Sequence, residues 1–296
     1  MNKQQGSITI PCLLAALLLL SFSAGILAFT TREYEHTKSY LINRQLRLLA
    51  SSVFKQAENV SYGKTELLEV FIYPDREKVV LTLEKTKSSD ELISMTEVTA
   101  EAVSHAGAMQ RFRQCSFRLT PAQQALVQEN ALIGIRFQGL ELLNAETRYI
   151  QAQEVSLPQI SFLQTLRSDT TASNIANDGL NAGFYYINGS FTFPTGGKTI
   201  AGSTVFAASK NIEIDTNTHF TGRVAFISEK GTISISKNCR FDNALLIAPN
   251  VLIKEGCKLS GCIISPSIII RGTGSFTPSA AVAEPFVSAV TLPNVS

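Results

Sequence analysis

Two carboxylates and three cations in the C-terminal third of the chain are the residues whose types could support catalysis. They are Asp215, Asp242, Arg223, Lys237 and Arg271. Clustered carboxylates hydrolyse glycosidic bonds, and an arginine or lysine base beside a metal ion could cleave a polysaccharide in another way. The five residues stand at different phases of the sequence repeat described below, which favours solvated turn charges. We therefore assign no catalytic residue and expect a protein that is not an enzyme.

Five cysteines are the next residues with chemical potential. Cys257 and Cys262 lack the Cys-x-x-Cys spacing of a zinc site, and Cys12 and Cys115 are isolated in the sequence. Cys239 and Cys257 share one repeat position, so their side chains would lie on adjacent strands about 4.8 Å apart. A disulfide prefers a Cβ separation of about 3.8 Å, so we expect buried thiols, with a disulfide as the alternative. No metal site and no cofactor are predicted.

The remaining candidate groups match no catalytic motif. The three histidines, His36, His105 and His219, have no serine or cysteine partner in a recognised arrangement. Gly196-Gly197-Lys198 lacks the context of a phosphate-binding loop. A formal net charge of only +2, without a basic stripe interleaved with aromatic residues, excludes a nucleic-acid partner.

The elements that position these residues follow from a repeat near the C-terminus. Four segments share one pattern of alternating apolar residues, at 211–214, 232–235, 250–253 and 267–270, spaced by 21, 18 and 17 residues. This period suits one circuit of a parallel β-solenoid. The apolar residues would point inward and stack, as Ile212/Ile214, Ile233/Ile235, Val251/Ile253 and Ile268/Ile270. With an earlier coil from Ser190, we predict a solenoid of about five coils over residues 180–283.

The outward positions of the same segments become more apolar along the stack. They are Glu213, Ser234, Leu252 and Ile269. An exposed apolar strip is a partner surface or is covered by the chain itself. We take Leu252 and Ile269 as an interaction surface and predict that the tail, residues 284–296, folds back over it. A polymer or partner interface is the alternative.

The N-terminal region reads as a membrane span. No residue from Gln4 to Thr31 is charged, and the 22 residues from Ile8 to Phe29 can cross a hydrocarbon core of about 30 Å. We predict a transmembrane helix at 7–31. A cleaved secretory signal is the alternative, but Ala28-Phe29-Thr30 is a poor cleavage site. The flanking charges leave the orientation open.

The middle of the chain predicts a stalk and a small module. An apolar stripe at helical spacing indicates a stalk helix over residues 32–62. It either forms a filament or binds partners, or its stripe packs on the domain that follows; we favour packing for the distal half. Residues 63–166 predict an α+β or mostly-β module, and residues 167–179 a linker. Within the module, strands are expected at 66–73, 78–86, 92–98, 111–119 and 133–143, and a short helix at 121–130.

The first residues resemble the start of type IV prepilins. Lys3-Gln4-Gln5-Gly6-Ser7 precedes an apolar helix that runs into a polar one. The resemblance implies a cytoplasmic leader at 1–6, cleavage between Gly6 and Ser7, and a membrane helix that packs in a filament core. Pro11 stands where that family usually carries Glu. Minor and tip pilins of the PilX type can lack this Glu, and Arg44-Gln45-Leu46 with Ala50 resembles the stretch after their membrane helix.

The short coils resemble those of bactofilins, scaffold proteins that polymerise end to end. Together the two resemblances imply a single-pass protein of the bacterial inner membrane, with most of the chain outside the cytoplasm and other pilins or filament-assembly proteins as partners. We expect a minor component or accessory of a type IV pilus or related secretion filament, whose solenoid binds a surface ligand, associates with itself or supports assembly. The alternatives are a tethered bactofilin-like scaffold that never enters a filament and, less favoured, a carbohydrate-active β-helix enzyme.

Overall fold

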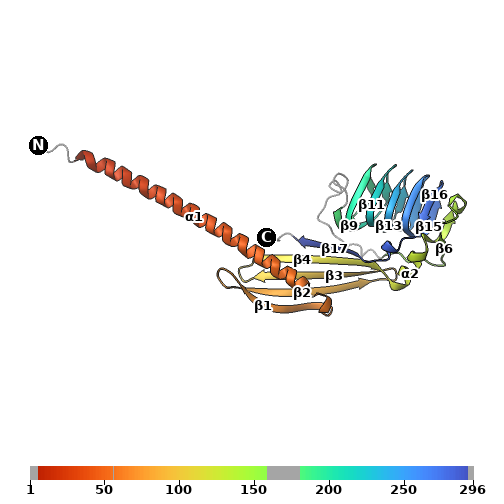
Figure 1. Cartoon of the computed structure of the whole chain (residues 1–296), viewed down its shortest axis with the longest axis horizontal. Coiled ribbons are helices and arrows are strands. Elements are labelled where there is room, and N and C mark those ends of the chain that lie inside the picture. Colours follow the sequence, from red (N-terminus) through yellow and green to blue (C-terminus); the bar gives the residue numbers. More distant parts are fainter. Residues whose placement is uncertain (1–5, 56, 159–180, 293–296) are drawn as a thin grey trace.

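The computed structural model of the chain describes residues 6–55, 57–158 and 181–292. It is mainly β, with 50% of residues in strands, a long N-terminal helix and a C-terminal parallel β-solenoid of about six turns. Figure 1 shows the helix projecting from one end of an antiparallel sheet and the solenoid seated over the other end. The predicted fold class is confirmed. The predicted linker and all of the leader except Gly6 lie outside the described residues.

One continuous helix, α1 (Gly6–Phe54), replaces the predicted membrane and stalk helices. It ends eight residues before the predicted boundary at 62, and a short 3₁₀ turn, η1 (Ala57–Asn59), follows. Beyond this end, the ammonium group of Lys85 on β2 (Glu77–Ser89) donates hydrogen bonds to the carbonyls of Ala57 and Val60, at 3.0 and 3.3 Å. A cation near a helix C-terminus interacts favourably with the helix dipole and with main-chain carbonyls there.

The last turns of α1 pack on the sheet. Leu46, Ala50 and Val53 are buried against a core that includes Leu81 and Leu83 of the sheet. The side chains at these three helix positions share one face, because they are spaced by three and four residues. The predicted packing of the distal stalk on the downstream module is therefore confirmed.

The sheet has five antiparallel strands. Their order is β1 (Gly63–Ile72), β2 (Glu77–Ser89), β3 (Ile93–Ser104), β4 (Met109–Leu119) and β17 (Phe286–Leu292). The prediction that the tail covers Leu252 and Ile269 is wrong, because β17 pairs with β4. Phe286 is buried there and meets Phe117 edge-on, with ring centroids 5.9 Å apart, so the tail completes the sheet's apolar core.

The solenoid strands stack in three parallel ladders. They are β7 (Asn181–Ile187), β8 (Phe191–Phe193), β9 (Gly197–Ala208), β10 (Ile212–Ile214), β11 (His219–Ser228), β12 (Thr232–Ile235), β13 (Arg240–Ile247), β14 (Asn250–Ile253), β15 (Cys257–Ile270) and β16 (Gly274–Thr277). We call the ladder of β8, β10, β12, β14 and 267–270 the first face. The second face holds β16 and the starts of β9, β11, β13 and β15. The third face holds β7 and the later parts of β9, β11, β13 and β15.

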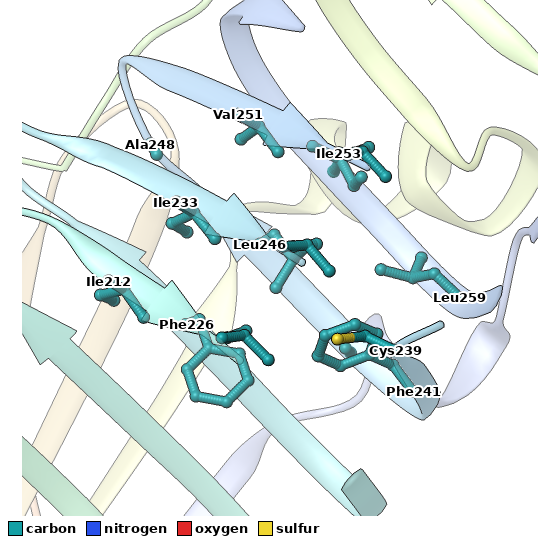
Figure 2. Packing of buried hydrophobic residues seen from close by; sticks show 14 of the residues in the cluster. Ile212, Phe226, Ile233, Cys239, Phe241, Leu246, Ala248, Val251, Ile253 and Leu259 are labelled. Carbon is teal, nitrogen blue, oxygen red and sulfur yellow. The ribbon is translucent and has the colours of Figure 1, made fainter. Parts of the chain in front are cut away.

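The first face has the predicted register. Ile212 pairs with Phe191 on one side and Ile233 on the other, and Val251 follows in the next coil. All four side chains are at most 7% exposed. Figure 2 shows Ile212, Ile233 and Val251 pointing into one interior together with Phe226 and Leu246 of the third face. The predicted inward ladder is confirmed.

The third face is buried on both sides. Phe226 and Leu246 point into the solenoid, whereas Ala225 and Leu245 point outward into a second core that contains Phe117 of the sheet. Strands covered on both faces have continuous apolar runs instead of alternation. This explains why residues 225–227 and 245–247 are apolar throughout. The solenoid therefore packs on the sheet through its third face.

A final coil comes from the middle of the chain. The helix α2 (Pro121–Glu129), which confirms the prediction at 121–130, leads into β5 (Leu132–Gln138), η2 (Leu140–Leu142) and β6 (Tyr149–Gln151). β5 pairs in parallel with β15, and β6 with β5. The prediction that these residues belong to the small module is therefore wrong at 132–151. The cause is long-range pairing, which adds the sixth coil.

Candidate functional site

The N-terminal part of α1 is apolar and bare. Every large apolar side chain described from Leu13 to Phe29 is at least 52% exposed. This segment gives the one helix among the described residues that is long and apolar enough to cross a membrane, with a mean hydropathy of 2.3. Gly6 begins the helix and Ser7 follows, and the helical backbone continues through Pro11. The side chains of residues 6–12 lie outside the described part of the chain.

The predicted interaction strip lies on the outward side of the first face. Leu252 pairs with Ile269 in register, and both are half-buried. Ser234 precedes them in this ladder and Gln138 follows Ile269, so polar residues border the strip on both sides. The strip is thus two side chains wide, and β17 pairs with β4 of the sheet instead of lying over it.

The five charged residues weighed for catalysis are dispersed. Asp215 accepts a hydrogen bond from the N–H of Thr216 at 3.0 Å, and Lys237 lies 3.7 Å from Glu255 in an exposed ion pair. Asp242 accepts hydrogen bonds from the side chains of its own coil and the preceding one, and Arg271 is exposed. The fifth residue, Arg223, serves a structural contact described next.

Arg223 joins the solenoid to the tail. It follows Gly222, whose φ of +95° makes the bulge where β11 shifts register against both neighbours. Its guanidinium donates to the carbonyls of Ala281 and Pro285 and to the Glu284 carboxylate at 2.9 Å. It also lies over the ring of Phe286, 4.6 Å from the centroid. Burial lowers the pKa of Arg223, although the Glu284 carboxylate opposes that shift.

A polar cluster marks the second face. His219 Nε2 lies 3.1 Å from Asp242 Oδ1, and Arg240 Nε lies 3.3 Å from the same oxygen. Beside them is a shallow hollow of about 360 Å³, bordered also by Lys258 and Ser275. With one carboxylate engaged by two partners, the cluster lacks the second acid that glycoside hydrolysis requires.

A second hollow, of about 560 Å³, lies beyond the end of α1. Its described lining includes three cations, Lys55, Lys85 and Arg118, and no carboxylate. Lys85 is occupied by the carbonyls beyond α1, and its ammonium lies 5.1 Å from the centre of the Tyr62 ring. The hollow could hold an anionic group but offers no nucleophile and base in contact.

The four described cysteines are buried and free, in agreement with the prediction of thiols. Cys257 lies in register with Gly274, as the repeat predicted, and Cys239 occupies the matching place one coil earlier. Each thiol donates to a carbonyl of a neighbouring coil, that of Asp215 for Cys239, at 3.0 Å, and that of Ser236 for Cys257, at 3.1 Å. The hydrogen bond to Cys257 and burial raise the pKa of Cys239, whereas the same hydrogen bond lowers the pKa of Cys257. Cys239 is therefore a neutral packing group, and Cys257 is its buried partner.

No group of three or more His, Cys, Asp or Glu side chains in the described part of the chain is placed to hold a metal ion. Residues that sequence reasoning missed are the exposed aromatics Phe71 and Tyr73, at the end of β1, and the tail contacts of Arg223. The signal for the first pair was an aromatic residue on each side of Ile72 beside a turn.

Comparison of the chain with models of protein families, with curated protein sequences and with solved structures gives no match. The functional argument therefore depends on the geometry described above.

Proposed function

We propose that this chain is a non-enzymatic, pilin-like membrane protein that displays its β-solenoid for adhesion or assembly. It would be a minor component or accessory of a type IV pilus or related secretion filament, with the bulk of the chain outside the inner membrane. One observation carries the proposal, namely that α1 is a single helix of 49 residues, bare and apolar at its start and packed on the sheet at its end.

This arrangement suits display at a distance. The 23 residues from Arg32 to Phe54 add about 35 Å of helix beyond the apolar stretch. The solenoid then sits over the end of the sheet that lies away from the bare helix (Figure 1). Its first and second faces are turned away from the sheet, because the third face makes the docking contact. A ligand or partner could reach them without moving the anchor.

The leader supports filament entry over simple anchoring. Gly6 and Ser7 match the prepilin cleavage site, and a bare helix that starts there could move from lipid into a bundle of similar helices. Pro11, in place of the usual Glu, supports a minor component over a major subunit. Pro11 lies five residues after Gly6, beyond the first turn of α1, so its missing N–H removes one main-chain hydrogen bond from the helix.

The test is the mass of the mature chain after coexpression with a prepilin peptidase. We expect a mature N-terminus at Ser7, and we expect Gly6→Val to abolish cleavage. Gly25→Val is the matched control, because a Cβ at Gly25 meets no atom within 4 Å, so cleavage should continue. A wild-type chain that keeps Met1 in the presence of active peptidase contradicts the proposal.

A tethered bactofilin-like scaffold is the second candidate. End-to-end growth needs free coil edges, but Leu132, Phe137, Leu142 and Leu143 of the last coil pack against the solenoid core at one end. Charged residues of this coil, such as Glu141 and Arg148, are exposed. Charged side chains beside a strand edge disfavour edge-to-edge pairing, which favours display over polymerisation. Unprocessed chains that form end-to-end polymers in electron micrographs would favour the scaffold instead.

A further inference from the structure

We propose that the turn between β1 and β2 rests on the lipid headgroups and fixes how the sheet sits above the bilayer. The inference rests on membrane insertion of α1, which is part of the proposed function. The surface consists of Phe71, Tyr73 and Arg76, together with Tyr34 of α1, and we call it the aromatic tip.

The aromatic tip is held at a fixed height on α1. The side chain of Gln45 accepts a hydrogen bond from the Tyr73 N–H at 3.0 Å and donates one to the Tyr73 carbonyl at 2.6 Å. Farther toward the N-terminus, Lys38 pairs with Asp75 in the turn itself. Two contacts, about two helical turns apart along α1, prevent the turn from swinging away from the helix.

This height matches the membrane surface. Lys38 lies seven residues beyond Thr31, the last residue of the uncharged stretch, which is about 10 Å along the helix. A headgroup layer is about 5–8 Å thick on each side of the hydrocarbon core. Transmembrane helices tilt by about 20° on average, and a tilt toward the sheet lowers the turn further. The aromatic tip is therefore within reach of the headgroups.

The side chains have the character of an interfacial anchor. Phe71 and Tyr73 are 69% and 71% exposed, and Tyr34 is 60% exposed. Tyr34 stands one turn before Lys38 on the same side of the helix. Tyrosine and other amphipathic aromatics concentrate at membrane interfaces, where the ring is partly buried and the hydroxyl stays hydrated. In water these exposed rings would bury no apolar surface, whereas at a membrane interface they would.

The charges around the turn suit phospholipid. Lys78 pairs with Glu69 at 2.7 Å, and Glu77 accepts a hydrogen bond from the Ala106 N–H at 2.7 Å. Asp75 is neutralised by Lys38. Arg76, exposed and at a φ of 55°, is then the charge of the turn that can meet lipid phosphates. The chemistry fits the headgroups of a phospholipid bilayer.

The chain has no tryptophan, so single substitutions give unambiguous fluorescence probes. We would reconstitute the full chain in phosphatidylcholine/phosphatidylglycerol vesicles with headgroup spin-labelled lipid as quencher. Tyr73→Trp and Phe71→Trp should be quenched and blue-shifted. Tyr62→Trp, at the opposite end of β1 and about 33 Å away, is the matched control and should not be quenched.

Phe22→Trp separates the two claims. Quenching of this probe by acyl-chain brominated lipid together with an unquenched Tyr73→Trp would overturn the aromatic tip and leave the membrane helix intact. If neither probe responds to lipid quenchers, the proposed insertion fails as well. A blue shift of Tyr73→Trp that depends on protein concentration and not on the quencher would assign the rings to contacts between copies, and would also overturn the inference.

Discussion

The hydroxyl of Ser203 on β9 makes two hydrogen bonds to Val287 on β17. It accepts one from the Val287 N–H at 3.0 Å and donates one to the Val287 carbonyl at 3.1 Å. β17 is the last strand of the sheet, so its outer edge would otherwise leave main-chain groups unpaired. A single buried serine therefore satisfies two main-chain groups at this strand edge and joins the sheet to the solenoid.

Replacing Ser203 with alanine should weaken this junction. Loss of the hydroxyl leaves a donor and an acceptor of Val287 without partners, which typically costs about 1–3 kcal/mol. The free energy of unfolding, measured by urea denaturation in detergent, should fall by that amount. Ser234→Ala removes an outward hydroxyl of β12 and should stay within about 0.5 kcal/mol of the parent. Equal losses in the two variants would contradict the role of Ser203.

Arg223 should matter more than its ion-pair partner. Its guanidinium binds two carbonyls and covers the Phe286 ring, whereas the Glu284 side chain is 70% exposed. We expect Arg223→Ala to lose about 1–3 kcal/mol through unpaired carbonyls. Glu284→Ala should lose at most about 1 kcal/mol, as exposed ion pairs do. Carboxypeptidase digestion should shorten the tail faster in the arginine variant alone; equal digestion of both variants would contradict this assignment.

The stacked interior could be predicted because its signal is local. Alternation within each segment and a period of 17–21 residues were enough to place Ile212 beside Ile233, and Ile233 beside Val251. The burial of the third face could have been inferred from its unbroken apolar runs. What covers it could not be inferred, because the covering residues, such as Phe117 and Phe286, lie more than a hundred positions away from some of their partners.

The last coil escaped prediction for a similar reason. Residues 132–138 have the pattern of a strand, but the choice between the sheet and the solenoid depends on pairing with β15, which lies about 130 positions later. The tail posed the same choice. The sequence of a strand indicates which of its side chains are apolar, but it does not indicate with which of two sheets the strand pairs. The aromatic tip could not be predicted either, because its distance from the membrane depends on where the turn between β1 and β2 packs along α1.

Stability should depend on pH through Cys115. Burial raises the pKa of this thiol to about 11, whereas an unfolded cysteine titrates near pH 8.5–9. Above about pH 9 the folded thiol keeps its proton, whereas the unfolded thiol has lost it. The stabilisation from Cys115 is therefore complete below about pH 8.5. As the pH rises toward 11, the free energy of unfolding declines by about 1.4 kcal/mol per pH unit. The free energy of unfolding, measured against pH by urea denaturation, should fall less steeply above pH 9 for Cys115→Ser than for the parent. Identical slopes in the two chains would contradict the raised pKa.

All four described thiols, including Cys115, should be unreactive in the folded chain. In a Cys12→Ala background, maleimide should label none of the four described cysteines until denaturant is added, because all are buried. Intact-mass measurement after labelling reports the number modified. Rapid native labelling, or a peptide containing a Cys239–Cys257 disulfide, would contradict the packing of free, buried thiols between coils.

Adjacent substitutions in β14 test the register of the whole stack. Val251 is fully buried and points inward, whereas Leu252 is half-buried on the outward side. Val251→Lys would bury an unpaired ammonium group and should cost several kcal/mol, enough to lower the melting temperature sharply. Leu252→Lys can extend its charge into water and should cost less than about 1 kcal/mol. The melting temperatures of the two purified variants, measured by circular dichroism, decide the matter. If Leu252→Lys were the more damaging change, the strand would present its other side to the core and the assigned ladders would be wrong by one residue.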